Sequence, residues 1–211
     1  MIILVANLKG GSGKSTIVFN LALWLQFKGQ PVVTYDLDPQ ATLSDVAQVR
    51  IDQGLMPPLQ VYGITEQLAD RLSYHPGHVL VDVGASSMQS MHDAISVADI
   101  ILVPVPPSQP DVWATQRFLQ IVHKAPKQKT PRLMAFVNRA DTHSAVRETD
   151  EAEQALKSLH DLEVLPTRVC QRTAFRRTLS EGMSIMELES KSKAAEEFNL
   201  FAQRLFSELQ K

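Results

Sequence analysis

A glycine-rich segment at residues 9 to 16 constrains this chain more than any other feature of its sequence. It reads Lys-Gly-Gly-Ser-Gly-Lys-Ser-Thr and comes shortly after an apolar run, Ile2–Ala6. Glycines let the backbone curl so that successive N–H groups point at phosphate oxygens, and the dipole of a following helix adds positive potential. The segment therefore predicts a phosphate-binding loop between the first strand and the first helix of an α/β fold.

The side chains of this loop suit Mg-ATP. Lys14 supplies a full positive charge to the β- and γ-phosphates, and the Ser15 hydroxyl is placed to ligate Mg²⁺. The usual pattern, G-x-x-x-x-G-K-[ST], has a glycine where this chain has Leu8, and a second lysine, Lys9, opens the loop instead. A glycine-rich turn that happens to precede a helix is the alternative interpretation. The predicted nucleotide-binding residues are Gly10, Gly11, Ser12, Gly13, Lys14, Ser15 and Thr16.

Apolar runs and amphipathic stretches alternate along the rest of the chain. Strands are predicted at Ile2–Ala6, Pro31–Tyr35, His78–Val83, Ile100–Val105 and Leu133–Val137, with a weaker one near Val164–Val169. Helices are predicted at Lys14–Phe27, Gly63–Leu72, Ser87–Val97, Val112–His123, Ala145–Leu159, Thr173–Glu181 and Met186–Leu209. Continuous apolar strands separated by helices are typical of a parallel sheet covered on both faces. The sequence predicts a three-layer α/β P-loop fold with a mostly parallel, doubly wound central sheet, in one domain over residues 1–211.

Composition excludes several other classes of protein. The 211 residues are 44% hydrophobic and 21% charged, which is ordinary for a globular domain. No apolar run approaches the roughly 18 residues that a membrane span requires. The first residues carry no positive charge before their apolar run, so they predict a core strand and not a secretory signal. The single cysteine, Cys170, cannot form an internal disulfide, and we expect a cytoplasmic setting.

Carboxylates stand at the ends of two further predicted strands. Asp36 and Asp38 are two residues apart on an extended chain and therefore point the same way, which suits gathering Mg²⁺ and orienting water. An Asp–Pro turn that merely closes a strand is the alternative interpretation. Asp82 ends an apolar run, where it can reach toward the metal, and Gly84 allows a flexible loop near the γ-phosphate.

These motifs resemble the ParA/MinD family of ATPases, in which the loop KGGxGK[ST][ST] is called a deviant Walker A motif. The resemblance extends over most of the chain, and residues 103 to 114 look like the proline-rich segment of small ParF-like partition ATPases. It implies that Lys9, Lys14 and Asp38 are catalytic. Lys9 reaches across a dimer interface to the partner's nucleotide, and Asp38 positions the attacking water.

The resemblance also implies roles in binding the metal ion and the base. Ser15, Asp36 and Asp82 serve Mg²⁺, with Asp36 holding a Mg-bound water. Asn138, at the end of the fifth predicted strand, reads the adenine base; asparagine at a strand end is also common without a function. ATP and Mg²⁺ are therefore the expected cofactors.

The function that the resemblance implies is the positioning or segregation of intracellular cargo by a slow ATPase. ATP closes a homodimer, the dimer binds nucleoid DNA without sequence preference, and a ParB-like or cargo-adaptor protein stimulates hydrolysis. The expected location is cytoplasmic and nucleoid-associated. The cargo stays open between a plasmid, a chromosome, a carboxysome-like organelle and a chemoreceptor cluster.

Two other classes of function use the same loop. A MinD-like, membrane-associated regulator needs a basic C-terminal helix, whereas this chain has Glu196, Glu197 and Glu208 there, so we expect no membrane binding. A P-loop enzyme that drives small-molecule or metallocluster chemistry needs a substrate domain or paired cysteines. The chain has one cysteine and no spare length.

Basic residues are concentrated in the second half of the chain. Residues 117–177 carry 12 Lys and Arg against 7 Asp and Glu, which is an excess of 5 positive charges. Contacts to DNA phosphates are predicted for Arg168, Arg172, Arg176 and Arg177, which could bind duplex DNA without reading its sequence. A solvated face that makes local ion pairs is the alternative interpretation.

Overall fold

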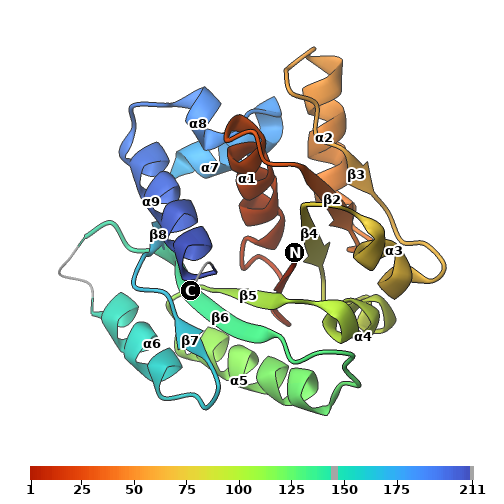
Figure 1. The fold of residues 1–211 in the computed structure, drawn as a ribbon. Helices are drawn as coiled ribbons and strands as arrows, with labels where there is room; N and C mark the ends of the chain where they lie inside the picture. The colour runs from red at the N-terminus through yellow and green to blue at the C-terminus, as the bar shows by residue number, and fades with distance from the viewer. Residues whose placement is uncertain (144–146, 210–211) are drawn as a thin grey trace.

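A computed structural model describes residues 1–143 and 147–209 (Figure 1). The strands are β1 (Ile2–Ala6), β2 (Val32–Asp36), β3 (Val61–Tyr62), β4 (His78–Val83), β5 (Ile100–Val105), β6 (Arg132–Ala140), β7 (Glu163–Val164) and β8 (Val169–Cys170). The helices are α1 (Lys14–Phe27), α2 (Thr42–Asp52), α3 (Leu68–Tyr74), α4 (Met88–Val97), α5 (Gln109–Lys124), α6 (Glu148–Lys157), α7 (Thr173–Glu181), α8 (Ile185–Leu188) and α9 (Lys193–Glu208).

The sheet has the order β3-β2-β4-β1-β5-β6-β7, with β8 paired to β6, and every strand pairing in the described residues is parallel. The chain runs from β1 through α1 to β2, two places away, and β4 later fills the gap between them. Residues of β1 are therefore flanked on both sides by β4 and β5. In such sheets ligands bind at the carboxyl ends of the strands, which is where the loop after β1 lies.

Helices cover both faces of this sheet (Figure 1). Alternate residues of β1 point to opposite faces, so Ile3 and Val5 belong to one buried cluster while Leu4 belongs to the other. The first cluster packs against α1, α2, α7, α8 and α9, and the second against α3, α4, α5 and α6. The predicted three-layer fold with its parallel, doubly wound sheet is confirmed.

The C-terminal predicted helix is two helices in the structure. Ser184 caps α8 with its side chain in a capping box, and Ser192 caps α9, so the prediction of one helix over Met186–Leu209 is wrong. Each cap satisfies backbone N–H groups that a continuous helix would have bonded internally. The apolar stripe of α9 packs on the sheet, with the rings of Phe201 and Phe136 4.3 Å apart. None of the described helices is long and apolar enough to cross a membrane.

Helix α2 has no counterpart among the predicted helices. Its buried residues are Leu43, Val46, Ala47 and Arg50, which follow the helical spacing i, i+3, i+4, i+7. The last of them is an arginine, which sequence reasoning assigns to the surface because charged side chains are rarely buried without a partner. The helical pattern of buried residues is therefore not recognisable in the sequence, because one of its four members is charged.

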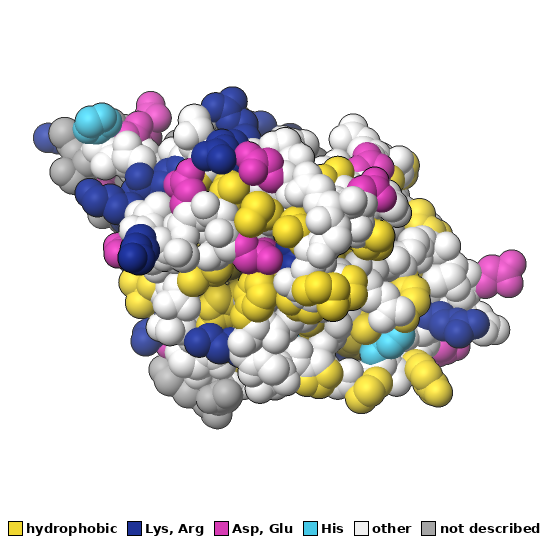
Figure 2. Space-filling view, turned by 90° about the horizontal axis from the view of Figure 1, so that it is seen from above, with side chains coloured by type: hydrophobic (Ala, Val, Ile, Leu, Met, Phe, Trp, Pro, Cys, Tyr) yellow, Lys and Arg dark blue, Asp and Glu magenta, His cyan; other side chains and the backbone are white. Residues whose placement is uncertain are grey.

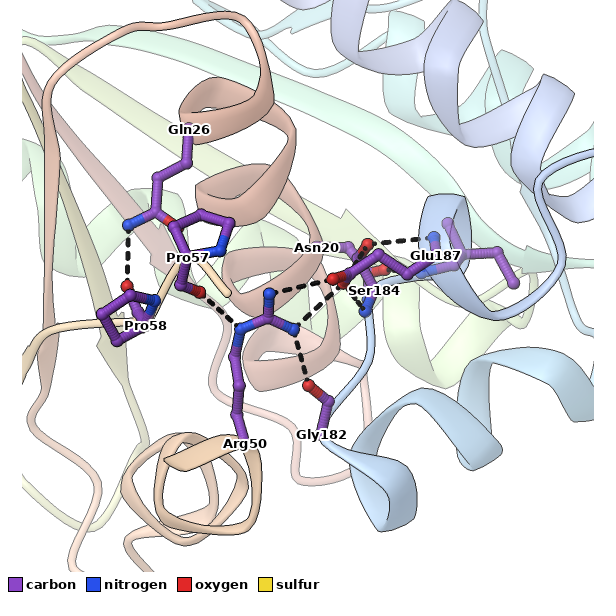
Figure 3. A network of polar contacts seen from close by, with 9 residues as sticks. Asn20, Gln26, Arg50, Pro57, Pro58, Gly182, Ser184 and Glu187 are labelled. Atoms are coloured by element: carbon purple, nitrogen blue, oxygen red, sulfur yellow. Dashed lines mark hydrogen bonds and ion pairs between the residues drawn. The ribbon is translucent and has the colours of Figure 1, made fainter. Parts of the chain in front are cut away.

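Arg50 is completely buried because its partners surround it (Figure 3). Its guanidinium donates hydrogen bonds to the carbonyl oxygens of Pro57 (2.7 Å) and Gly182 (2.9 Å), and it forms a two-point ion pair with Glu187 at 2.9 and 3.0 Å. Glu187 also accepts hydrogen bonds from the backbone N–H and hydroxyl of Ser184. We call these five residues the Arg50 cluster. They fix α2 to the turn between α7 and α8.

Candidate nucleotide-binding site

The glycine-rich loop lies between the carboxyl end of β1 and the start of α1, as predicted. Gly13 has a φ of 93°, and a Cβ at this position would clash with the side-chain amide of Asn138. Only glycine combines this left-handed backbone with so close a neighbour. The amide of Asn138 then donates a hydrogen bond to the carbonyl oxygen of Ser12 at 2.7 Å.

Side chains from other elements hold the loop at two more points. Asn7, which is fully buried, donates to the carbonyl oxygen of Pro104 (3.0 Å) and accepts from the N–H of Lys9 (3.1 Å). Arg139 at the end of β6 donates to the carbonyl oxygen of Gly11 at 2.7 Å. Sequence reasoning missed both Asn7 and Arg139. Arg139 carried a signal, since it directly follows Asn138 at a strand end.

Two adjoining cavities flank the loop. One, of about 370 Å³, is lined by every loop residue from Gly10 to Thr16 except Ser12 and by Asp38, Gly84 and Arg139, and we call it the phosphate cavity. The other, of about 340 Å³, is lined by Asn138 together with apolar and polar residues of the segment 169–179, and we call it the base cavity. They share the residues Gly13, Thr16, Arg139 and Leu179. The elongated, two-part shape suits a nucleotide, whose phosphates and base have different chemistry.

Asp82 is the next-to-last residue of β4, lies opposite Val5 of β1 and is completely buried. Burial raises the pKa of its carboxyl to about 7; the Ser15 hydroxyl and the Lys14 ammonium oppose the rise, and the charge of Asp36 adds to it. Among the described residues, neither carboxylate oxygen makes a hydrogen bond of good geometry. A buried acid with unsatisfied oxygens next to a serine hydroxyl fits a divalent cation that prefers oxygen ligands.

Asp36 lies beside Asp82, because the two are register partners on β2 and β4. Its carboxylate is already hydrogen-bonded: it accepts from the N–H and hydroxyl of Ser44 (2.9 and 3.0 Å) and from the N–H of Asp38 (3.2 Å). Asp36 therefore anchors the start of α2 to the strand end. Its predicted role toward a Mg-bound water stays a prediction.

Asp38 lies at the phosphate cavity and faces Gly84 from the loop after β4. Its carboxylate accepts a hydrogen bond from the N–H of Gln40 at 3.0 Å. A Cβ at position 84 would meet this carboxylate, so a larger residue there would displace the Asp38 side chain from its present position. The structure thus brings Asp38, Asp82, Lys14 and the loop together at one edge of the sheet.

Lys9 contacts a residue of its own chain. Its ammonium lies 2.8 Å from the carboxylate of Asp111, which is 3% exposed and stands in the first turn of α5. Asp111 also pairs with the hydroxyl of Ser108, the residue that caps this helix. The reach of Lys9 toward a partner's nucleotide stays a prediction. In this structure a buried acid 102 residues away holds the lysine.

The four arginines predicted to bind DNA have different surroundings. Arg168 pairs with Asp150 and Glu153, Arg172 with Glu197, and Arg177 with Glu181 and Glu189. Arg176 is exposed at the rim of the base cavity and makes no ion pair with the described residues.

Local pairing of three of these charges reduces the positive potential of this region. Figure 2 shows basic and acidic side chains interspersed on one face of the molecule. DNA binding by these arginines stays a prediction.

Comparison with known proteins agrees with the site. A model of the CobQ/CobB/MinD/ParA nucleotide binding domain matches residues 3–185. The chain is 31% identical over 204 residues to the maintenance of carboxysome distribution protein A of Halothiobacillus neapolitanus, covering 92% of this chain and 91% of that protein. It is 25% identical over 219 residues to protein ParA of Rhizobium radiobacter, covering 99% and 97% of the two.

The fold also matches solved structures. A putative plasmid partition protein of Borrelia burgdorferi B31, solved with AMPPNP bound, superposes with a TM-score of 0.75 over 98% of both chains. Only 17% of the aligned residues are identical. At this level of identity the match establishes the three-layer fold.

Proposed function

This chain belongs to the CobQ/CobB/MinD/ParA family of nucleotide-binding domains, and we therefore propose that it is a ParA-type ATPase that positions or segregates intracellular cargo. The observation that carries this proposal is the buried, unsatisfied carboxylate of Asp82 beside a phosphate-binding loop. Such a group destabilises the protein unless a ligand occupies the site. A magnesium nucleotide supplies that ligand.

In this proposal the nucleotide occupies both cavities, with its phosphates in the phosphate cavity and its base in the base cavity. The N–H groups of the loop and the ammonium of Lys14 bind the β- and γ-phosphates. Ser15 and Asp82 would hold Mg²⁺, which would supply positive charge that neutralises the phosphates. The base enters the base cavity, which the Asn138 side chain helps to line. The amide of the same side chain holds the loop through the carbonyl oxygen of Ser12.

Hydrolysis is an in-line attack of water on the γ-phosphate, and Asp38 is the group that orients this water. Asp38 is partly exposed at the phosphate cavity and packed against Gly84, so a shift of the segment containing either residue moves it relative to the phosphates. We expect slow intrinsic turnover because a single carboxylate orients the water. A cargo-bound adaptor protein accelerates the step.

Dimerisation links nucleotide binding to cargo. Lys9 stands at the rim of the site with its side chain 45% exposed, so it can leave Asp111 and reach a nucleotide held by a second copy of the chain. A cation placed on developing phosphate charge stabilises the transition state. The ATP-bound homodimer binds nucleoid DNA through arginines that include Arg176. Relatives named for carboxysome distribution and for ParA support cargo positioning.

The experiment that tests this function measures retention of the protein on random-sequence duplex DNA with ATP, ADP or no nucleotide, over a salt series. We expect binding with ATP only, weakening steeply with salt as phosphate contacts are lost. Lys14→Ala should abolish it, and the double substitution Arg176→Ala/Arg177→Ala should weaken it. Arg117→Ala is the matched control, because Arg117 is an exposed arginine on α5 away from the site.

The same assay separates this function from the other classes. If the protein binds nucleotide but does not bind DNA with ATP, with ADP or without nucleotide, the proposed mechanism that depends on DNA binding is overturned. Lipid vesicles and then small-molecule substrates would become the next ligands to test. A measured ATPase rate that rises only when adaptor protein and DNA are both present would support the complete cycle.

A further inference from the structure

Arg139 has a left-handed backbone at an irregularity in the pairing of β6 with β8, where the register shifts between Asn138 and Ala140. Its φ is 57°, in the left-handed region, and it is one of four described residues other than glycine with a positive φ. It follows a buried strand residue, Asn138, and precedes another, Ala140, while its own side chain is exposed. A strained residue outside glycine persists where the surroundings impose it, and such residues cluster at binding and catalytic sites.

The guanidinium of Arg139 lies over the phosphate-binding loop without a carboxylate partner. Its one hydrogen bond among the described residues goes to the carbonyl oxygen of Gly11, at 2.7 Å. By contrast, Arg168 and Arg172 are both paired with glutamates. One neutral carbonyl leaves most of the five N–H donors of a guanidinium unused, together with its whole charge.

The location of Arg139 connects the two halves of the site. It is one of the residues that line both the phosphate cavity and the base cavity. It also borders a smaller hollow, of about 260 Å³, with Asp141 and Glu148, neither of which accepts a hydrogen bond from it. A nucleotide that spans the two cavities must therefore pass this side chain.

We propose that Arg139 is a nucleotide-binding residue that grips the phosphate chain of a nucleoside di- or triphosphate. This assignment rests on the proposed function, since it requires ATP or ADP in the two cavities. Binding exchanges the single bond to Gly11 for charge-assisted hydrogen bonds to phosphate oxygens, which the planar guanidinium matches well. The left-handed backbone places the side chain over the loop before the nucleotide arrives.

A purely structural role for Arg139 would have a different signature. If the residue served only to hold the loop through Gly11, a neutral donor such as glutamine would replace it, and losing the donor would destabilise the ligand-free protein. If Arg139 binds phosphate, its positive charge contributes most of the affinity. Lysine at this position should then restore nucleotide binding better than glutamine. Glycine at position 139 removes the side chain and also relieves the backbone strain.

The test uses the full chain and its Arg139→Gly, Arg139→Lys and Arg139→Gln variants, with Arg117→Ala as a control that removes an exposed arginine bonded to a backbone carbonyl elsewhere. Affinities for ATP, ADP and adenosine are measured by competition against a fluorescent ADP analogue with Mg²⁺ present. Thermal unfolding is measured without nucleotide.

We expect Arg139→Gly and Arg139→Gln to weaken ATP and ADP by about tenfold or more, with adenosine unchanged. The ATP affinity of Arg139→Lys should stay within about threefold of the parent, because lysine keeps the positive charge and loses only the two-point hydrogen bonding of the guanidinium. The melting temperature of ligand-free Arg139→Gly should not fall.

Three results would overturn the assignment: ATP affinity in Arg139→Gly within about twofold of the parent, equal rescue by glutamine and lysine, or weaker adenosine binding of the same size. Each of these requires that the parent chain binds ATP. If the parent binds neither ATP nor ADP, the proposed function itself fails, and this outcome is distinct from the other three.

Discussion

The Arg50 cluster and the surroundings of Asp82 are both buried and both charged, yet they differ in how completely their polar atoms are hydrogen-bonded. The guanidinium of Arg50 donates to two backbone carbonyl oxygens and to both oxygens of the Glu187 carboxylate, which itself accepts a hydrogen bond from Ser184. Asp82 has two carboxylate oxygens without a hydrogen bond among the described residues, and the nearby Ser12 hydroxyl has none either.

This difference distinguishes a structural cluster from a ligand site. Buried charge is tolerated when its partners are built into the fold, as they are around Arg50. Where partners are lacking, the fold carries the unfavourable free energy of the unsatisfied group until a ligand arrives. The same chain therefore contains one polar cluster that stabilises the protein and one that stabilises a complex.

The largest effect is expected from Glu187→Gln, which leaves the charge of Arg50 buried without its counter-ion. We expect the free energy of unfolding to fall by about 3 kcal/mol or more, as when one partner of a buried ion pair is removed. Urea unfolding followed by circular dichroism measures it. Glu181→Gln is the matched control: its pair with Arg177 is exposed, so the loss should be under about 1 kcal/mol. Equal losses in the two variants would contradict the contrast.

Asp82 should make the metal-free, nucleotide-free protein less stable as pH rises. Its folded pKa of about 7 lies above the ordinary value of 3.8, so the folded state holds the proton more tightly than the unfolded state. The contribution to stability is therefore greatest below pH about 4 and is lost as pH rises to about 7, by about 2 to 4 kcal/mol.

Asp82→Asn should lack this decline, so at pH 8 it should be more stable than the parent. Urea unfolding of both proteins at several pH values, with a chelator present, gives the difference. Parallel pH profiles would show that burial does not penalise the Asp82 carboxylate in this way.

Ser12→Ala tests the unsatisfied hydroxyl of the loop. Because the hydroxyl is fully buried without a partner, removing it should raise the stability of the ligand-free protein, by about 1 kcal/mol. The hydroxyl is buried and does not line the phosphate cavity, so ATP affinity should stay close to that of the parent. Thermal unfolding and nucleotide titration measure the two effects, and a loss of stability without nucleotide would indicate a structural bond instead.

The smallest effect is expected from Asp111→Asn, which removes the ion pair to Lys9. The lysine is half exposed, so the pair should contribute only about 0.5 to 1 kcal/mol to the free energy of unfolding. The consequence for assembly is more informative: without Asp111 the lysine is available to a second subunit. Sedimentation with ATP should show more dimer than in the parent, and an unchanged or lower dimer fraction would argue against competition between Asp111 and the partner.

The core strands and two helices were predictable because their signals are local. The boundaries of β4, β5, α1 and α7 agree with the predicted His78–Val83, Ile100–Val105, Lys14–Phe27 and Thr173–Glu181. Strands buried on both faces appear in the sequence as uninterrupted apolar runs, and the loop glycines identify the first helix start. The strand ends then place Asp38 and Asp82 at one edge of the sheet.

Other features depend on residues far apart in the chain. The helical stripe of α2 includes Arg50, which reads as a surface residue until Glu187, 137 positions later, is seen beside it. The partner of Lys9 is 102 positions away. The spacing of Arg172 and Arg177 suggested a shared basic face, but Arg172 pairs with Glu197 on α9, and Arg177 pairs with Glu189 after α8 as well as with Glu181 on its own helix.

The sequence by itself determined the fold class, the phosphate-binding loop and the set of carboxylates at its edge, because strand burial and loop geometry are encoded in neighbouring residues. The tertiary structure alone decided which charges are paired. It paired Arg50 with Glu187 and Lys9 with Asp111, and left Asp82 and Arg139 without an oppositely charged hydrogen-bond partner among the described residues. The physical reason is that the free energy of a charge depends on its burial and on its nearest neighbours in space, which the order of residues does not specify.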